Sequence, residues 1–310
     1  MPQIALGIAA GSLIDLLVGD PARFHPVAAF GRVACALERI MWRPSRVVGA
    51  LYTLALVGAT GGAAWILSAR LGRHSWGLAA FTAVVVWAVL GGRSLAREAL
   101  RIAEAVDRDD LEEARRRLPV LVGRDPSTLD GDGICRAVVE SVAENTSDAV
   151  VAPLLWCALA GPAGAVGYRA ANTLDAMVGY RSERHERFGW AAARLDDLLN
   201  WPAARLSAFL SIALAPCVSG DAGRALRVVR RDGSAHPSPN SGKVEAAFAG
   251  AFGVRLGGTN RYGQRVERRP CMGEGETPGV ETVRQAVRLS RLVGAAAGLG
   301  CSLVAWGLWR

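Results

Sequence analysis

The chain contains 310 residues, of which 51% are hydrophobic, 6% aromatic and 21% charged, and its formal net charge is +8. Such an apolar composition argues against an ordinary soluble two-domain enzyme and indicates a membrane protein. The positive charge is almost wholly arginine, since Lys243 is the only lysine. These arginines are spread between apolar stretches and do not gather in one basic helix, which argues against a nucleic-acid-binding protein.

Six apolar stretches approach the roughly 20 residues that a helix needs to cross a bilayer. We predict membrane helices near residues 3–19, 47–69, 75–92, 149–168, 203–220 and 292–309. The first stretch contains Asp15 and is either a span with a functional acid or a buried helix. Pro153 and Pro162 interrupt the fourth stretch, which predicts a broken or re-entrant helix.

Polar blocks separate these stretches at residues 20–46, 93–148, 169–202 and 221–291. The arginines between Arg23 and Arg46 assign the first block to the cytoplasm under the positive-inside rule. The segment 93–119 has apolar residues at helical spacing and predicts an amphipathic helix. The last block, rich in Gly, Pro and Arg, predicts a cytoplasmic loop with short helices.

The expected fold class is therefore all-α, a polytopic integral membrane protein with cytoplasmic loops. We expect a single membrane-embedded domain over residues 1–310. The six cysteines form no CxxC pair and lie mostly among apolar residues. This pattern predicts neither a disulfide framework nor a zinc site.

Three acids, Glu140, Glu144 and Asp148, recur at every fourth residue in a segment expected to be helical. On one helix face their charges repel, so a cation should lie opposite them. One interpretation is a solvated stripe that Arg136 partly neutralises. The other is a metal site, because the stripe runs into an apolar segment where unneutralised acids are unfavourable.

A short internal repeat of the pattern NTxDAxV begins at Asn145 and again at Asn172. In a helix, Asn and Asp three residues apart project oxygen atoms from one face, and Mg²⁺ prefers oxygen ligands. The repeat therefore predicts a magnesium site. Asp196, Asp197 and Asn200 form a third polar cluster, which either joins this site or caps and solvates a helix.

Two further segments suit anion binding. The first contains Arg169, Arg181, Arg184, His185 and Arg187, which either clamp a phosphate or are ordinary juxtamembrane arginines. The second runs from His236 to Lys243 and lacks the leading glycine of a P-loop. It predicts a rigid turn that opens a helix and points backbone N–H groups toward an anion.

Four separated motifs are recognisable together in this chain. They are Gly19-Asp20-Pro21 with Arg23 and His25-Pro26, the run from Val139 to Asp148, the run from Ala171 to Tyr180, and the run from Pro237 to Gly242. In this order they resemble the adenosylcobinamide-phosphate synthase family, the CobD and CbiB proteins of cobalamin biosynthesis. The resemblance covers nearly the whole chain. One departure is Lys243-Val244, where the family pattern has an aromatic residue and proline.

The resemblance implies a multi-pass membrane ligase. Such an enzyme joins (adenosyl)cobyric acid to aminopropanol or aminopropanol O-phosphate, with ATP as co-substrate, and gives (adenosyl)cobinamide or its phosphate. The implied mechanism is phosphorylation of the corrinoid carboxylate by ATP, followed by attack of the amine on the acyl phosphate. Mg²⁺ would neutralise the phosphates.

Site residues follow from this interpretation. Glu144 and Asp175 are the candidate catalytic residues, because either could accept the amine proton. The candidate metal ligands are Glu140, Glu144, Asp148 and Asp175. The candidate residues for nucleotide and phosphate are Asn145, Asn172, Arg181, Arg187, Asn240 and Ser241.

The implied partners are the corrinoid substrate, the amine, ATP and membrane lipid, with no nucleic acid. A homo-oligomer and a complex with other cobalamin-pathway proteins both stay open. The implied location is the inner (cytoplasmic) membrane, with the active site facing the cytoplasm. A rival enzyme is a Mg²⁺-dependent intramembrane transferase acting on a lipid diphosphate, which would need an apolar substrate tunnel and no ATP. A transporter with broken helices is a third interpretation.

Overall fold

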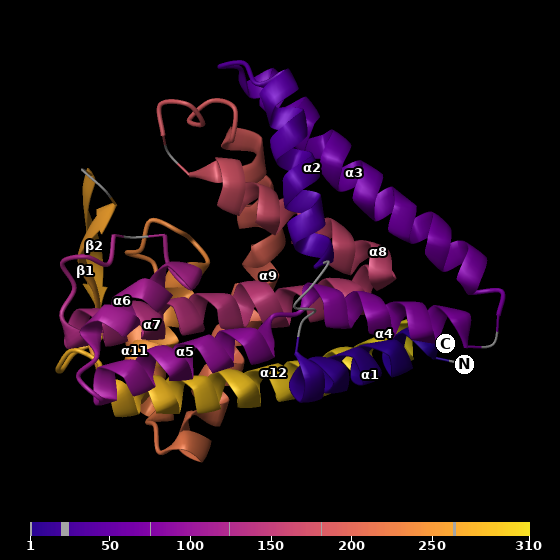
Figure 1. The fold of residues 1–310 in the computed structure, drawn as a ribbon. Helices are drawn as coiled ribbons and strands as arrows, with labels where there is room; N and C mark the ends of the chain where they lie inside the picture. Colours follow the sequence, from indigo (N-terminus) through magenta and orange to yellow (C-terminus); the bar gives the residue numbers. More distant parts are fainter. Residues whose placement is uncertain (1, 20–24, 75, 124, 181, 263–264) are drawn as a thin grey trace. The chain divides into compact units, whose positions relative to one another are not determined.

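The protein, seen in a computed structural model, is described over residues 2–19, 25–74, 76–123, 125–180, 182–262 and 265–310. Helices make up most of it, and within these ranges one antiparallel hairpin is the only sheet (Figure 1). The predicted all-α class is therefore confirmed. The α-helices are α1 (Gln3–Val18), α2 (Pro26–Met41), α3 (Arg46–Leu71), α4 (Gly77–Val89), α5 (Gly92–Asp107), α6 (Leu111–Arg117), α7 (Gly131–Thr146), α8 (Ala152–Leu174), α9 (Trp190–Leu214), α10 (Ala222–Arg231), α11 (Ser241–Phe252) and α12 (Val280–Leu308).

The chain divides into two compact units, a subdivision that the sequence did not predict. The first unit comprises Met1–Gly91, Asp148–Trp201 and Ala297–Arg310. The second comprises Gly92–Ser147 and Pro202–Ala296. One boundary lies between Ser147 and Asp148, just beyond α7, and another lies inside α9, so each unit is built from segments that are distant in the sequence.

Several helical stretches are long and apolar enough to cross a membrane. In the described part of the chain they are Arg46–Leu71, Gly77–Asp107, Gly131–Gly179, Trp190–Val218 and Val280–Leu308. Each overlaps one of the predicted stretches. The remaining predicted stretch, residues 3–19, forms α1, which is apolar but has only 16 residues. This is the pattern of a multi-pass membrane protein.

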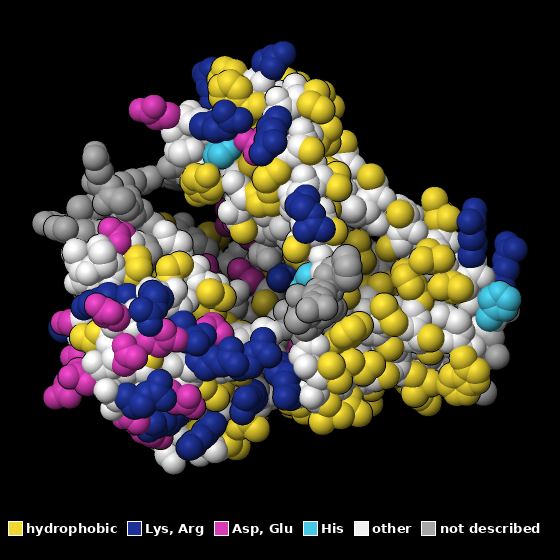
Figure 2. Space-filling view, in the orientation of Figure 1, with side chains coloured by type: hydrophobic (Ala, Val, Ile, Leu, Met, Phe, Trp, Pro, Cys, Tyr) yellow, Lys and Arg dark blue, Asp and Glu magenta, His cyan; other side chains and the backbone are white. Residues whose placement is uncertain are grey.

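The first unit carries its apolar side chains on the outside as well as in the core. In α3, Leu54 and Trp65 are 62% and 66% exposed, and in α12 Leu303 is 74% exposed. Figure 2 shows hydrophobic side chains gathered over α1, α3 and α4. An apolar surface of this extent is unfavourable in water and is the surface that lipid would cover.

The helix predicted to be broken is broken. Inside α8, Ala160 (φ −130°, ψ 18°) and Gly161 (φ 65°, ψ −163°) leave the helical region, and Pro162 follows them. Proline removes a backbone donor and clashes with the preceding turn, while glycine tolerates the positive φ. The helix therefore changes direction at this point.

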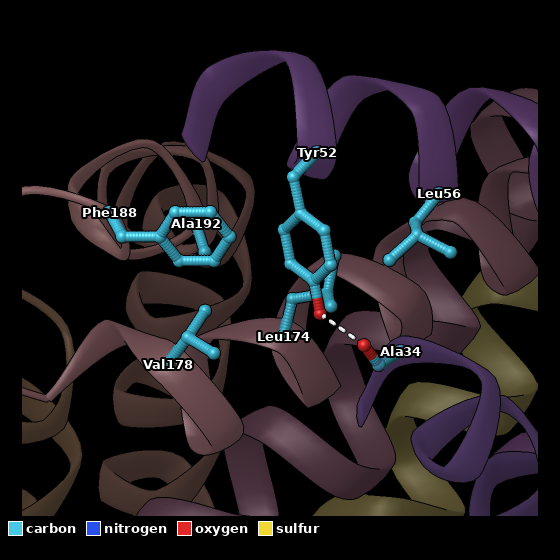
Figure 3. Packing of buried hydrophobic residues seen from close by; sticks show 7 residues of the cluster. All are labelled: Ala34, Tyr52, Leu56, Leu174, Val178, Phe188 and Ala192. Atoms are coloured by element: carbon cyan, nitrogen blue, oxygen red, sulfur yellow. Dashed lines mark hydrogen bonds between the residues drawn. The ribbon is translucent and has the colours of Figure 1, made fainter. Parts of the chain in front are cut away.

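A small aromatic core holds the first unit together where α2, α3, α8 and α9 meet (Figure 3). The ring of Tyr52 lies 5.0 Å from that of Phe188, and its hydroxyl donates a 3.0 Å hydrogen bond to the Ala34 carbonyl. Gly49 permits this packing, because a Cβ there would lie 1.8 Å from the Phe188 carbonyl oxygen. The contact fixes the segment that precedes α9.

The second unit corrects two expectations about the polar blocks. The predicted helix over residues 93–119 is two helices, α5 and α6, because Asp109 adopts a left-handed conformation (φ 59°) and the Asp110 side chain caps α6. The block 221–291 is more than a loop with short helices. It contains the hairpin of β1 (Leu256–Tyr262) and β2 (Arg265–Met272), and α12 already begins at Val280.

Candidate functional site

Both copies of the NTxDAxV pattern lie where an α-helix passes into a wider π-helical turn. Asn145 and Thr146 end α7, and the π turn η2 (Ser147–Val151) follows. Asn172 and Thr173 stand near the end of α8, and the π turn η3 (Asp175–Gly179) follows. The sequence repeat is therefore also a repeat of local structure. Single π turns inside helices occur frequently at functional sites.

The same type of side-chain hydrogen bond precedes each junction between α-helix and π turn. The Thr146 hydroxyl lies 2.6 Å from the carbonyl of Val142, and the Thr173 hydroxyl lies 2.7 Å from that of Arg169. Threonine that bonds back to the carbonyl four residues earlier loosens the helix locally. The threonines of the motif thus prepare the widened turns that carry the acids.

In the first unit, a chain of hydrogen bonds starts at the second junction. Arg169 donates to Asn172 Oδ1 (3.3 Å), and Asn172 Nδ2 donates to Asp196 Oδ1 (3.1 Å). Asn200 Nδ2 lies 3.3 Å from Asp196 Oδ2. The carboxylate of Asp196, only 8% exposed, therefore accepts amide protons on both oxygens.

Tyr168 carries this network to the first junction. Its hydroxyl lies 3.0 Å from Asn200 Oδ1 and 3.0 Å from the backbone carbonyl of Asp148. Both atoms are acceptors, so the single phenolic proton is shared between them. Tyr168 therefore links the turn at Asp148 to the hydrogen bonds around Asn172. We call the side chains of this network the amide cluster: Tyr168, Arg169, Asn172, Asp196 and Asn200.

Asp175 opens the second π turn and is half-buried. Its carboxylate lies directly over Gly179, where a Cβ would come within 1.8 Å of Asp175 Oδ1. Any side chain at position 179 would therefore displace this acid. Glycine at the end of the turn is required by the position of Asp175.

In the second unit, Glu140 is 3% exposed and is held by the hairpin. The backbone N–H of Gly257 donates to Glu140 Oε1 over 2.8 Å, and Arg136 Nε lies 4.0 Å from the same oxygen. Gly257 has φ +86°, and a Cβ there would lie 2.2 Å from the Pro270 carbonyl oxygen. Only glycine fits this bulge, which directs the N–H at the acid.

Glu144 meets the turn that precedes α11. The Ser241 hydroxyl donates to Glu144 Oε1 over 2.8 Å, and the backbone N–H groups of Asn240 and Ser241 approach the Ser238 hydroxyl at 3.3 and 3.2 Å. From α9, Arg205 donates to Asn240 Oδ1 over 2.8 Å. We call this arrangement the serine turn: Glu144, Arg205, Ser238, Asn240 and Ser241.

His236 lies behind the serine turn. Its Nδ1 accepts the N–H of Ser238 (3.0 Å), and its Nε2 lies 3.9 Å from Glu245 Oε1 and 3.5 Å from Arg269 Nη1. Burial, followed by the Arg269 guanidinium, lowers the pKa of His236 below its usual 6.5. The neutral imidazole is therefore the form that this site favours.

The comparisons with known proteins decide the family. The model of the CobD/Cbib protein family matches residues 8–290. The chain belongs to this family. It is 54% identical over 298 residues to the cobalamin biosynthesis protein CobD of Mycobacterium tuberculosis, covering 95% of this chain and 94% of that protein.

Two more distant relatives bear the same name. The chain is 46% identical to the CobD of Geobacter metallireducens, with 93% of each chain covered, and 44% identical to that of Stutzerimonas stutzeri, with 99% of each covered. No solved structure matches the chain. The family resemblance predicted from the four motifs is confirmed.

The structure divides the predicted acidic stripe between the two units. Glu140 and Glu144 belong to the second unit, whereas Asp148 belongs to the first. Among the described residues, no group of three or more His, Cys, Asp and Glu side chains could hold a metal ion by itself. Mg²⁺ commonly needs only one or two carboxylates beside substrate phosphates and water. The acids present fit Mg²⁺ that arrives with a nucleotide, and a dedicated metal cage is not seen in this part of the chain.

The residues of the predicted basic segment contact different parts of the protein. Arg184 and His185 bond to Glu38 of α2 at 3.1 and 3.0 Å, and Arg169 belongs to the amide cluster. Arg187 is exposed, and Arg181 lies outside the described residues. Burial raises the pKa of Glu38, but the hydrogen bonds from His185 and Arg184 outweigh this effect and leave it lowered. Arg184 and His185 therefore anchor α2.

The remaining predicted residues are placed as follows. Asn145 donates back to the Ser141 carbonyl within α7 (3.0 Å), and Asp197 pairs with Arg194 (3.3 Å). All six cysteines are free. The site predictions did not include Tyr168, Arg205 or His236. Only His236 had a sequence signal, because it begins the run that contains the serine turn.

Proposed function

We propose that the chain is a cobalamin-biosynthesis enzyme, an ATP-dependent ligase that forms an amide bond. The substrates are (adenosyl)cobyric acid and aminopropanol or its O-phosphate, and the product is (adenosyl)cobinamide or its phosphate. The observation that carries the proposal is the family match over residues 8–290, together with relatives whose name is cobalamin biosynthesis protein CobD.

The reaction needs an activated carboxyl group. An oxygen of the corrinoid carboxylate attacks a phosphorus atom of ATP. Attack at the γ-phosphorus expels ADP with the electron pair and gives an acyl phosphate, whereas attack at the α-phosphorus expels pyrophosphate and gives an acyl adenylate. The amine nitrogen then attacks the acyl carbon, the C–O bond to phosphate or to AMP breaks, and the nitrogen loses one proton. No protein nucleophile is required, so the protein must orient the reactants, neutralise phosphate charge and accept the proton.

The serine turn supports the phosphate-handling part. It combines a cation, Arg205, with the Asn240 and Ser241 side chains and with backbone N–H groups at the start of α11. Helix N-termini and guanidinium groups both bind phosphate well. Mg²⁺ bound with the nucleotide would supply charge neutralisation at the phosphates, and Glu144 is the acid of the serine turn that could hold it.

The amide cluster supports the amine-handling part. A buried carboxylate, Asp196, with two amide side chains around it suits a protonated amino group, which donates several hydrogen bonds. Asp175 is the candidate base for the amine proton, with Glu144 as the other candidate.

We further propose that the enzyme lies in the cytoplasmic membrane with its site open to the cytoplasm, because ATP is supplied there. The transferase rival would need an apolar substrate tunnel, and the first unit does contain an apolar cavity. A requirement for ATP separates the two functions, since a lipid-diphosphate transferase draws its energy from the diphosphate.

The test uses the full chain, purified in detergent and given cobyric acid, Mg²⁺ATP and aminopropanol phosphate, each omitted in turn. Mass spectrometry of the corrinoid should find the amide only when all three are present. Aminopropanol in place of its phosphate shows which amine is used. Absence of product from folded protein that binds ATP would contradict the ligase and favour the transferase.

A further inference from the structure

An apolar cavity of about 310 Å³ lies in the first unit, between α2, α3, α4 and α8. Val85 and Val89 of α4, Phe30 of α2 and Val166 of α8 are among its walls. Its volume is roughly twice that of the ~150 Å³ apolar cavity that stays dry in water and holds a benzene ring. A cavity of this size with apolar walls suits an apolar ligand.

The threonines in the wall do not change this character. Thr60 donates its hydroxyl to the Leu56 carbonyl (2.8 Å), and Thr173 donates to the Arg169 carbonyl (2.7 Å). The hydroxyl protons of both threonines are therefore donated within their own helices. Among the described residues that line the cavity, Arg169 is the only charged one, and its guanidinium also donates to Asn172. In the described part of the chain, the cavity thus offers apolar walls with a single cation.

The cavity opens onto the apolar outside of the unit. Pro26 is exposed and Val84 is 54% exposed, and both line the cavity. Three of its walls, α3, α4 and α8, belong to stretches long enough to cross a membrane. An occupant can therefore enter sideways from the surface that a bilayer covers.

We propose that this cavity binds one acyl chain of an anionic membrane phospholipid, with the lipid phosphate on Arg169. The acyl chain buries apolar surface against the valine and phenylalanine side chains of the cavity, and the Arg169 guanidinium binds the lipid phosphate. Because Arg169 also holds Asn172, the bound lipid stabilises the orientation of the amide cluster. The lipid is a retained component and is not consumed.

The test measures binding, so it is independent of the ligase activity. The detergent-solubilised full chain is stripped of lipid and titrated with phosphatidylglycerol or phosphatidylcholine, and retained lipid is counted by native mass spectrometry. We expect one tightly bound phosphatidylglycerol, bound at least ten times more tightly than phosphatidylcholine. Arg169→Gln should remove this headgroup preference, while the acyl chain of the lipid still binds in the cavity.

Ala88→Phe fills the cavity, and Ala80→Phe makes the same change at an exposed position of α4. The first should weaken phosphatidylglycerol binding at least tenfold and the second should not. Equal binding by both variants would overturn the proposal. So would displacement of the lipid by saturating cobyric acid, which would make the cavity a substrate site. If Ala88→Phe does not fold, the wild-type protein decides, since no headgroup preference there also overturns the proposal.

Discussion

The Ser241 hydroxyl donates a 2.8 Å hydrogen bond to Glu144 Oε1, and this bond joins two segments that are 97 residues apart in the chain. It links the acidic motif at the end of α7 to the turn that begins α11. The two motifs that the sequence offered separately are therefore parts of one arrangement within the second unit.

Glu144→Gln tests the charge of this acid. Glutamine keeps an oxygen that can accept from Ser241, so the variant should fold as the wild type does. Loss of the negative charge should lower kcat by about 10² or more, the range found for acid–base groups. Amide formation and circular dichroism are measured together, with Glu112→Gln, an exposed acid in α6, as the matched control. An active Glu144→Gln enzyme would remove Glu144 from both of its proposed roles.

Gly257→Ala tests the link between the hairpin and Glu140. The added Cβ would lie 2.2 Å from the Pro270 carbonyl oxygen at φ +86°, so the bulge must shift and withdraw its N–H from Glu140. We expect a loss of roughly 1–3 kcal/mol in unfolding free energy. Thermal unfolding measures it, with Gly279→Ala as control, because nothing lies within 4 Å of a Cβ there. Equal melting temperatures for the two variants would contradict the description of this bulge.

Asp196→Asn tests the amide cluster. The new amide nitrogen would face the amide of Asn172 or Asn200, so at least one buried donor would lose its acceptor. An unsatisfied buried donor costs about 1–3 kcal/mol, and binding of the amine should weaken as well. Asp197→Asn is the neighbouring control, because that acid pairs with Arg194 and a change there should stay within about 0.5 kcal/mol. Chemical denaturation and the KM for the amine are the two measurements, and similar effects at both positions would argue against the cluster.

The lowered pKa of His236 predicts a pH dependence of stability. The unfolded chain binds a proton below about pH 6.5, whereas the folded site resists it. His236 therefore contributes its full stability above pH 6.5 and loses it as the pH falls from 6.5 toward the folded-state pKa. Melting temperatures between pH 5 and 8 should drop at the acid end, and His236→Gln should flatten that drop. His74→Gln, at an exposed position, should leave the profile unchanged, and a flat wild-type profile would contradict the prediction.

The membrane helices could be predicted because their signal is local. Each predicted stretch overlaps an apolar helix, and the break in α8 follows from Gly161 and Pro162 themselves. The NTxDAxV repeat was also visible in the sequence. That both copies lead into π turns was not. A π turn depends on how the following helix packs, which the pattern alone does not contain.

The partners of the motifs could not be predicted. Tyr168 and Arg205 look like ordinary members of apolar helices. Their roles arise only from contacts with residues distant in the sequence, Tyr168 with Asn200 in the first unit and Arg205 with Asn240 in the second. The hairpin was missed because its glycines and charges resemble a loop, and its strands are specified by their pairing. The break between α5 and α6 depends on one left-handed residue, Asp109, which periodicity does not reveal.

If ATP activates the corrinoid carboxylate before the amine attacks, one oxygen atom of that carboxylate must pass to phosphate or to AMP, and isotope labelling can follow it. Cobyric acid labelled with ¹⁸O in its free carboxyl group is given to the enzyme with Mg²⁺ATP and the amine, and phosphate and AMP are analysed by mass spectrometry. We expect one ¹⁸O atom to be transferred for each amide formed, to inorganic phosphate if ADP leaves and to AMP if pyrophosphate leaves. Amide formation with no ¹⁸O in either product would contradict it.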